Sequence, residues 1–146
     1  MTNHEYTSDD YYTPKQVFDL LDVQFDLDPA HPPFQTNVPC TTYYTINDDG
    51  LTQPWFGNVW MNPPFSKPRP WVEKFVQHGN GIALLPQSKS QWFYDLWQSA
   101  AAITTFGSSL RFVDPKGGKG SILMPTCLIA FGEKNIEAIS RIGKVR

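Results

Sequence analysis

A run of apolar residues without polar interruption, "GIALLP" at residues 81–86, limits the folds open to this chain more than any other segment. A half-exposed strand alternates apolar and polar side chains, whereas a continuous apolar run between breakers indicates a strand buried on both faces. Such a strand needs helices on both sides of its sheet. The run therefore predicts an α/β protein with a mostly parallel sheet covered by helices.

Helical and strand-like segments alternate along the rest of the chain, which favours the same fold class. The sequence predicts strands over residues 23–27, 57–62, 81–86 and 101–106, and helices over residues 11–22, 70–78, 88–100 and 134–144. Two further strands within residues 108–132, joined by a glycine- and lysine-rich loop, predict a hairpin that adds an antiparallel edge. Residues 31–50 contain several prolines and an Asn-Asp-Asp-Gly turn signal, so we expect them to be irregular.

Three of these helices carry more detailed predictions. We expect Thr13 to cap the first helix and Pro14 to take its first helical position. The second helix should begin at Pro70 and end at Gly79. Apolar side chains at helical spacing are expected to face the core in the first helix (Val17, Leu20 and Leu21), in the second (Trp71, Val72, Phe75 and Val76) and in the third (Trp92, Phe93, Leu96 and Trp97).

Length and composition exclude several classes of protein. A chain of 146 residues fits one domain, residues 1–146, and a charged fraction of 18% is too low for a disordered tail protein. No apolar run is long enough to span a bilayer and no leader precedes the first helix, so we expect a cytoplasmic protein without a membrane partner. Cys40 and Cys127 are far apart and lack clustered histidines, which predicts two reduced thiols and no metal site.

Charge is distributed unevenly along the chain. The net charge of -2 argues against a dedicated nucleic-acid coat. The first 50 residues contain nine acidic residues and one lysine, whereas basic residues dominate from Lys67 onward. This pattern is compatible with an enzyme that touches nucleic acid through one local patch.

Two of the predicted strands end in polar residues followed by proline. One ends in "DLDPA" and the next in "MNPPF". Because ligands bind at the carboxyl ends of the strands in such sheets, Asp28 and Asn62 are expected at one rim. The side-chain oxygen of Asn62 and the backbone carbonyl of Pro63 could accept both N–H bonds of an exocyclic base amine, and Phe65 could stack on the base. The alternative interpretation is that "NPPF" is only a rigid loop.

The order of several segments resembles a known family. These segments are "YYTPKQVFDLL", "FDLDPA", "DDGL" ahead of a tryptophan, "VWMNPPFS", "GNGIALLP" and "RF" before the last hairpin. Together they resemble the small phage-type DNA N6-adenine methyltransferases, the phage Dam family, from about residue 11 to about residue 131. The resemblance implies a compact Rossmann-like methyltransferase fold and transfer of a methyl group from S-adenosylmethionine to adenine N6 in double-stranded DNA.

The resemblance also implies roles for particular residues. The catalytic group would be Asn62, Pro63, Pro64 and Phe65, and the cofactor-binding group Tyr12, Thr13, Pro14, Asp28, Pro29 and Ala30. Asp48 or Asp49, with Asp49 preferred, would contact the adenine amine of the cofactor, although both also suit an ordinary Asp-Asp-Gly turn. Basic residues near the site or in the hairpin loop would touch DNA phosphates: Lys67, Arg69, Lys116 and Lys119.

The chain departs from the family pattern in three places. Prolines replace the usual glycine-rich turn after "DLD", and His31 lies there either near the cofactor or as a structural residue. Phe65 stands where tyrosine is common. The chain is also short, which predicts a truncated sheet and leaves open a homodimer that replaces a recognition domain. A methyltransferase for another amine or amide (protein glutamine or RNA guanine N2) and an inactive cofactor- or DNA-binding relative remain alternatives.

Overall fold

The computed structural model describes residues 13–64, 66–87, 89–99, 102–105, 126–143 and 145, and the backbone of two short strands, β6 (Phe112–Val113) and β7 (Lys119–Gly120). Its main sheet has six strands. In spatial order they are β2 (Cys40–Tyr43), β1 (Phe25–Asp28), β3 (Val59–Met61), β4 (Gly81–Pro86), β8 (Thr126–Phe131) and β5 (Ala102–Thr105). Neighbouring pairs from β2 to β4 are parallel, and β8 runs antiparallel to both β4 and β5. The prediction of a mostly parallel α/β sheet is therefore confirmed.

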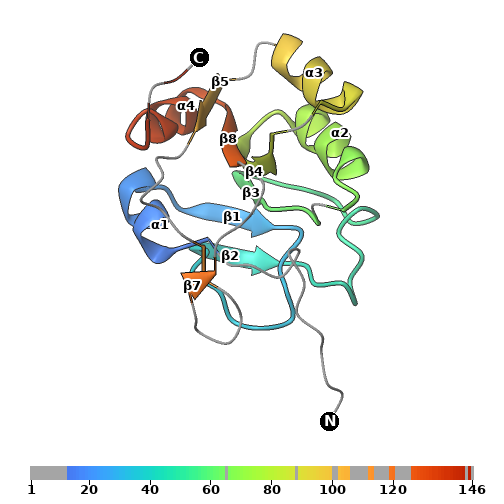
Figure 1. Ribbon diagram of the computed structural model, residues 1–146. Helices are drawn as coiled ribbons and strands as arrows, with labels where there is room; N and C mark the ends of the chain where they lie inside the picture. Colours follow the sequence, from blue (N-terminus) through green and yellow to red (C-terminus); the bar gives the residue numbers. More distant parts are fainter. Residues whose placement is uncertain are drawn as a thin grey trace.

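Four helices cover the two faces of this sheet. Helices α1 (Lys15–Leu21) and α4 (Glu133–Ile139) pack on one face, and α2 (Arg69–His78) and α3 (Gln91–Gln98) pack on the other (Figure 1). Within the ranges that the structure describes, none of the helices has the length and apolar character needed to cross a membrane.

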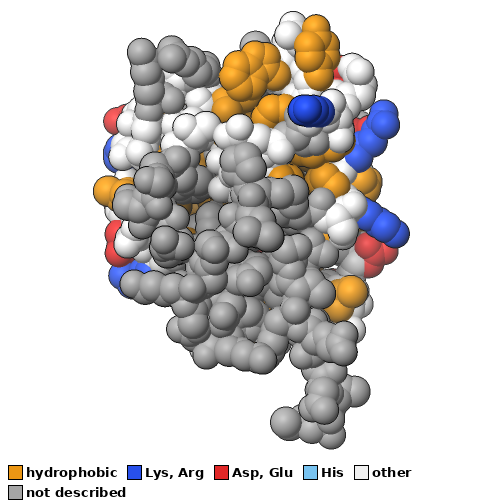
Figure 2. Space-filling view, in the orientation of Figure 1, with side chains coloured by type: hydrophobic (Ala, Val, Ile, Leu, Met, Phe, Trp, Pro, Cys, Tyr) orange, Lys and Arg blue, Asp and Glu red, His pale blue; other side chains and the backbone are white. Residues whose placement is uncertain are grey.

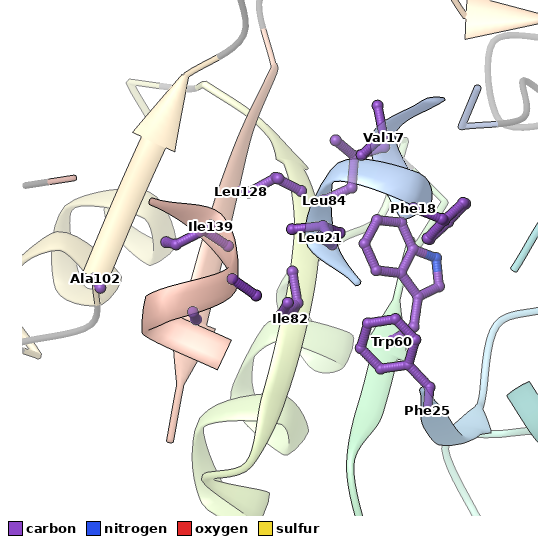
Figure 3. Close-up of a cluster of buried hydrophobic side chains, with 12 residues drawn as sticks. Val17, Phe18, Leu21, Phe25, Trp60, Ile82, Leu84, Ala102, Leu128 and Ile139 are labelled. Atoms are coloured by element: carbon purple, nitrogen blue, oxygen red, sulfur yellow. The ribbon is translucent and has the colours of Figure 1, made fainter. Parts of the chain in front are cut away.

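Alternate residues of the central strands fill two separate cores. In β3, Trp60 faces α1 and α4, whereas Val59 and Met61 face α2 and α3, and all three are buried. Trp60 lies edge-on to Phe18, with ring centroids 4.8 Å apart, and 5.7 Å from Phe25 (Figure 3). All six residues of β4 are buried, as the uninterrupted apolar run predicted.

Two predictions about strands are wrong. Residues 40–43 form β2, although we expected residues 31–50 to be irregular. Strand β8 lies inside the sheet, between β4 and β5, instead of adding an antiparallel edge to it. The residues around the glycine- and lysine-rich loop do pair with each other, since β6 runs antiparallel to β7, but in a separate two-stranded ribbon. Truncation of the sheet relative to larger methyltransferases stays a prediction.

Each predicted helix is present, but α1 begins at Lys15 and α4 ends at Ile139, so both are shorter than the predicted ranges 11–22 and 134–144. Pro14, not Thr13, is the N-cap of α1, and no side chain caps that helix. Gly79 ends α2 in the left-handed conformation, as expected. Leu20 and Trp97 do not belong to the core, because their side chains are 47% and 50% exposed. Trp97 belongs to α3, where Tyr94 is also largely exposed, and hydrophobic side chains are visible on the surface over this helix (Figure 2).

Candidate active site

The order of the strands reverses next to β1. From β1 the chain passes to β2 on one side and then returns to β3 on the other, and all three strands are parallel. Ligands of such sheets bind beyond the carboxyl ends of the strands at this reversal. Leu27 of β1 pairs with Val59 of β3, so Asn62 lies two residues further along the strand direction than Asp28. At the rise of an extended strand, this offset is about 7 Å.

The Asn-Pro-Pro segment follows β3 directly. Asn62 and Pro64 are partly buried, and Pro63 is buried. The carbonyl of Pro64 accepts a hydrogen bond from the backbone N–H of Lys67 at 3.2 Å. Among the described contacts, neither the Asn62 side chain nor the Pro63 carbonyl takes part in a hydrogen bond. These two predicted acceptors are therefore unoccupied by protein donors in the described part of the chain. Phe65 lies outside the described residues.

The carboxyl group of Asp28 is buried at the end of β1. The residue is 2% exposed, and its Oδ1 accepts a hydrogen bond from the backbone N–H of Ala30 at 3.2 Å. Burial raises the pKa of this carboxyl to about 8, and the hydrogen bond from Ala30 only partly offsets the effect. Pro29, the next residue, is also buried. A buried carboxyl of this kind suits a ligand that brings a positive charge or a donor.

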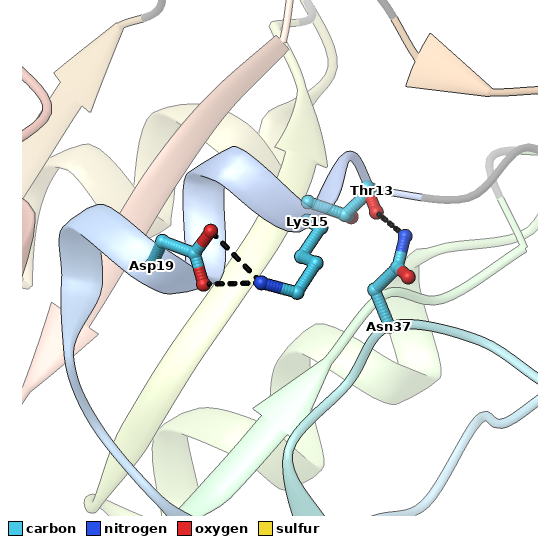
Figure 4. A network of polar contacts seen from close by, with 4 residues as sticks. All are labelled: Thr13, Lys15, Asp19 and Asn37. Carbon is cyan, nitrogen blue, oxygen red and sulfur yellow. Dashed lines mark hydrogen bonds and ion pairs between the residues drawn. The ribbon is translucent and has the colours of Figure 1, made fainter.

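Thr13 contributes a second buried polar group. The residue is 4% exposed, and its hydroxyl oxygen has no hydrogen-bond partner among the described residues. Its carbonyl accepts a hydrogen bond from the side-chain amide of Asn37 at 3.2 Å, which joins the start of α1 to the loop after "DLDPA" (Figure 4). Pro14 is buried beside it. Because buried polar groups are rarely left unpaired, Thr13 fits the edge of a polar ligand site. Tyr12 lies outside the described residues.

The acidic loop after β2 packs against the "DLDPA" segment. A Cβ atom added at Gly50 would lie 2.0 Å from the carbonyl oxygen of Pro29, so only glycine allows this approach. Asp48 caps the turn, because its Oδ2 accepts hydrogen bonds from the backbone N–H and the hydroxyl of Thr45, at 2.8 and 3.3 Å. Asp49 is exposed and has a left-handed φ of 58°, and the described contacts show no partner for its carboxylate. The arrangement therefore leaves Asp49 the freer of the two carboxylates.

His31 contacts two residues of its own loop and one residue of β2. Its Nδ1 lies 2.6 Å from the Pro32 carbonyl and its Nε2 lies 3.3 Å from the Thr36 hydroxyl. The ring stacks on Tyr43 at 4.3 Å, and burial lowers the pKa of the imidazole. These contacts favour the structural interpretation of His31 over a role in binding the cofactor.

The four predicted DNA-contacting residues differ in how far the structure describes them. Lys67 and Arg69 are exposed beside the Asn-Pro-Pro segment, and Arg69 forms an exposed ion pair with Glu73 at 3.0 Å. Lys116 lies outside the described residues, and of Lys119 only the backbone, in β7, is described. The structure thus brings two of the four to the rim of the sheet.

Sequence reasoning assigned no function to three residues that hold the acidic loop. They are Tyr44, Trp55 and Lys74, whose side chains donate hydrogen bonds to backbone carbonyls of residues 50–54. The tryptophan after "DDGL" was one sign of the family resemblance. Nothing in the sequence distinguishes Lys74 from an ordinary solvent-facing lysine of a helix.

Comparison with known proteins identifies the family of the chain. The fold is that of a doubly wound α/β protein, and Asp28 and Asn62 lie at the ends of the two strands that flank the reversal of strand order. The chain matches the family "DNA N-6-adenine-methyltransferase (Dam)" over residues 2–143. The chain therefore belongs to this family, and the resemblance seen in the sequence is confirmed.

Two relatives of the chain are phage proteins. It is 36% identical over 101 residues to a DNA N-6-adenine-methyltransferase of Escherichia phage T1, an alignment that covers 62% of this chain and 42% of that protein. It is 28% identical over 119 residues to a DNA N-6-adenine-methyltransferase of Haemophilus phage HP1, covering 73% of this chain and 68% of the relative. The chain thus matches less than half the length of the T1 protein.

Proposed function

We propose that this protein transfers a methyl group from S-adenosylmethionine to the N6 amine of adenine in DNA. Membership of the family sets the class of reaction. The observation that supports the proposal most directly is a pair of adjacent acceptors at the reversal of strand order, the Asn62 side chain and the Pro63 carbonyl, which no donor of the described residues occupies. Both relatives are named for this activity.

The two acceptors match what the amine needs. The nitrogen lone pair of adenine N6 is delocalised into the ring, so the amine is a weak nucleophile. Acceptors on both N–H bonds would orient the amine and stabilise the positive charge that develops on N6 as it accepts the methyl group. The sulfonium would leave as a neutral thioether, and the methylated amine would release one N–H proton to water. Pro63 and Pro64 restrict the backbone, which keeps the Pro63 carbonyl in place.

The cofactor is proposed to bind between the start of α1, the end of β1 and the acidic loop. Bound S-adenosylmethionine would supply an electrophilic methyl group. The Thr13 hydroxyl and the Asp28 carboxyl are buried polar groups that fit the methionine end, whose ammonium supplies a cation. Pro14, Pro29 and Ala30 line the same segments, and Asp49 is the preferred contact for the adenine amine.

Double-stranded DNA is the proposed partner. The target adenine must leave the helix to reach Asn62, and Phe65 would stack on it. Lys67 and Arg69 are proposed phosphate contacts next to the site, and Lys116 and Lys119 further ones. A homodimer stays a prediction.

The reaction itself tests the proposal. Purified protein is incubated with labelled S-adenosylmethionine and, in parallel, with DNA, RNA and protein substrates, and the products are digested and identified by mass spectrometry. We expect N6-methyladenine in DNA. Label on glutamine or guanine N2 would favour the other methyltransferases. Cofactor binding without methylation of any DNA would favour an inactive relative and contradict the proposal.

Replacement of Asn62 tests the role of the amide. Asn62→Ala removes one acceptor for the amine, and loss of one such group costs about 100-fold or more in kcat. Cofactor affinity, measured by calorimetry, should change little because Asn62 is assigned to the base. The matched control is Gln77→Ala, which removes an exposed amide on α2. Loss of cofactor binding in Asn62→Ala would contradict this assignment.

A further inference from the structure

The loop that follows the acidic turn is joined to it by a backbone hydrogen bond from the Thr52 N–H to the Asp49 carbonyl at 2.9 Å, and side chains hold its other carbonyls. The indole N–H of Trp55 donates to the Gly50 carbonyl at 2.8 Å, and the Tyr44 hydroxyl donates to the Pro54 carbonyl at 2.8 Å. The ammonium of Lys74 donates to the Leu51 and Gln53 carbonyls at 2.8 and 2.6 Å. Four carbonyls within residues 50–54 are thus held outside any strand or helix.

Lys74 belongs to α2, which follows the Asn-Pro-Pro segment in the sequence, whereas the loop precedes that segment. It is half-buried, and its ammonium lies 5.4 Å from the centroid of the Trp55 ring. A charged donor shared by two carbonyls and an aromatic face makes stronger contacts than a neutral donor would. The loop therefore depends on this one cation for two of its carbonyls.

A second side chain of α2 completes the contact. Trp71 stacks on Trp55 with ring centroids 6.3 Å apart. Its Cη2 atom lies 3.2 Å from the position that a Cβ atom would take at Gly50. Gly50 thus fits between the Pro29 carbonyl and Trp71. Through these contacts α2 fixes the position of the acidic turn relative to the "DLDPA" segment.

The turn that α2 holds contains the carboxylates proposed to bind the cofactor. Asp49 immediately precedes Gly50, and its own side chain makes no described contact that would fix the turn. A short irregular segment loses conformational entropy when it becomes ordered, and a binding site must meet that cost before or during binding. Side chains that fix the loop in advance raise the affinity of the site.

We infer that Lys74 is a positioning residue for the cofactor, holding the turn at residues 48–50 in the conformation that receives the adenine end of S-adenosylmethionine. The inference rests on the proposed function. Lys74 touches neither cofactor nor base and acts through the carbonyls of Leu51 and Gln53.

The test is Lys74→Met, which keeps the length of the side chain and removes the donor. We expect the calorimetric Kd and the KM for S-adenosylmethionine to rise at least tenfold. The kcat at saturating cofactor should stay within about twofold, because the amine acceptors are untouched. Lys74→Arg, which keeps charge and donors, should restore affinity to within about threefold of wild type. Lys134→Met, which removes an exposed lysine on α4, is the matched control.

Other outcomes separate the two proposals. Unchanged Kd and KM in Lys74→Met, or a lower kcat with unchanged KM, would overturn the positioning role and leave the proposed function standing. Should Lys74→Met fail to fold, Trp55→Phe removes the donor to Gly50 and reduces the ring that faces Lys74 and Trp71, and it should raise KM about threefold. An unchanged KM in that variant would also overturn the role. Wild-type protein that binds no S-adenosylmethionine would overturn the proposed function first.

Discussion

Asp28 makes the stability of the folded protein depend on pH. Its pKa is raised to about 8 by burial, from an ordinary value of 3.8. The folded state therefore favours the protonated form more than the unfolded state does. The stability from this group is fully present below about pH 3.8 and is lost as the pH rises to about 8. Folding thus favours the protonated form of Asp28, whereas binding of a cationic ligand favours the ionised form.

Asp28→Asn tests this dependence. The amide keeps an acceptor for the Ala30 N–H and cannot ionise. Between pH 5 and 7.5, the free energy of unfolding of the variant should increase relative to wild type by up to about 1.4 kcal/mol per pH unit. Urea denaturation across this range measures the difference. Asp95→Asn, an exposed carboxylate on α3, controls for the loss of one charge. A difference that stays constant with pH would show that Asp28 is ionised in the folded protein.

At the scale of elements, close packing of the acidic loop against β1 gives Gly50 a different role from Gly79. A methyl group at Gly50 would meet the Pro29 backbone at 2.0 Å, whereas at Gly79 the nearest atom is 3.8 Å away and only the φ of 73° is unfavourable. Gly50→Ala should therefore destabilise the protein by about 2 kcal/mol or more. Gly79→Ala should cost about 1 kcal/mol. Chemical denaturation measures both losses of stability. A smaller loss for Gly50→Ala than for Gly79→Ala would contradict the close packing of Gly50 against Pro29.

The elements also show what the sequence could predict. Strand β4 was predictable because burial on both faces leaves a continuous apolar run. Strand β2 was not, because "CTTY" lies at the edge of the sheet with alternately exposed side chains, between prolines and an acidic turn. The position of β8 was missed because hydrophobic patterns indicate a strand and not its partner.

The candidate site divides in the same way. The positions of Asn62, Pro63 and Asp28 at the carboxyl ends of β3 and β1 could be predicted from the strand patterns, whereas their roles stay predictions. Lys74 could not, because its function depends on a loop more than twenty positions away in the sequence. Thr13 was predicted as a helix cap from its residue type, whereas its hydroxyl is buried and has no hydrogen-bond partner among the described residues.

At the scale of the whole molecule, the sheet separates two cores. Trp60 belongs to the core beneath α1 and α4, and Phe75 to the core beneath α2 and α3. Trp60→Leu and Phe75→Leu should each destabilise the protein by about 2 kcal/mol. Their effects should add within about 0.5 kcal/mol, because the residues share no partner across the sheet.

A second pair of variants concerns two residues of the same core, for which additivity is not expected. Phe18 and Trp60 are in contact, so Phe18→Leu combined with Trp60→Leu should deviate from additivity by about 0.5–1.5 kcal/mol. Denaturation of the single and double variants measures both cycles. Strong coupling between Trp60 and Phe75 would show that the two faces do not pack independently.

The position of β8 has a consequence for how the protein is made. Strands β4 and β5 are translated before β8, yet β8 lies between them and pairs with both. Until residues 126–131 leave the ribosome, these two strands present unpaired backbone edges, a form of chain that readily associates with others. The sheet therefore closes only after β8 has left the ribosome, and a released chain that ends at residue 120 should be far more open to protease and chaperone than the released chain of 146 residues.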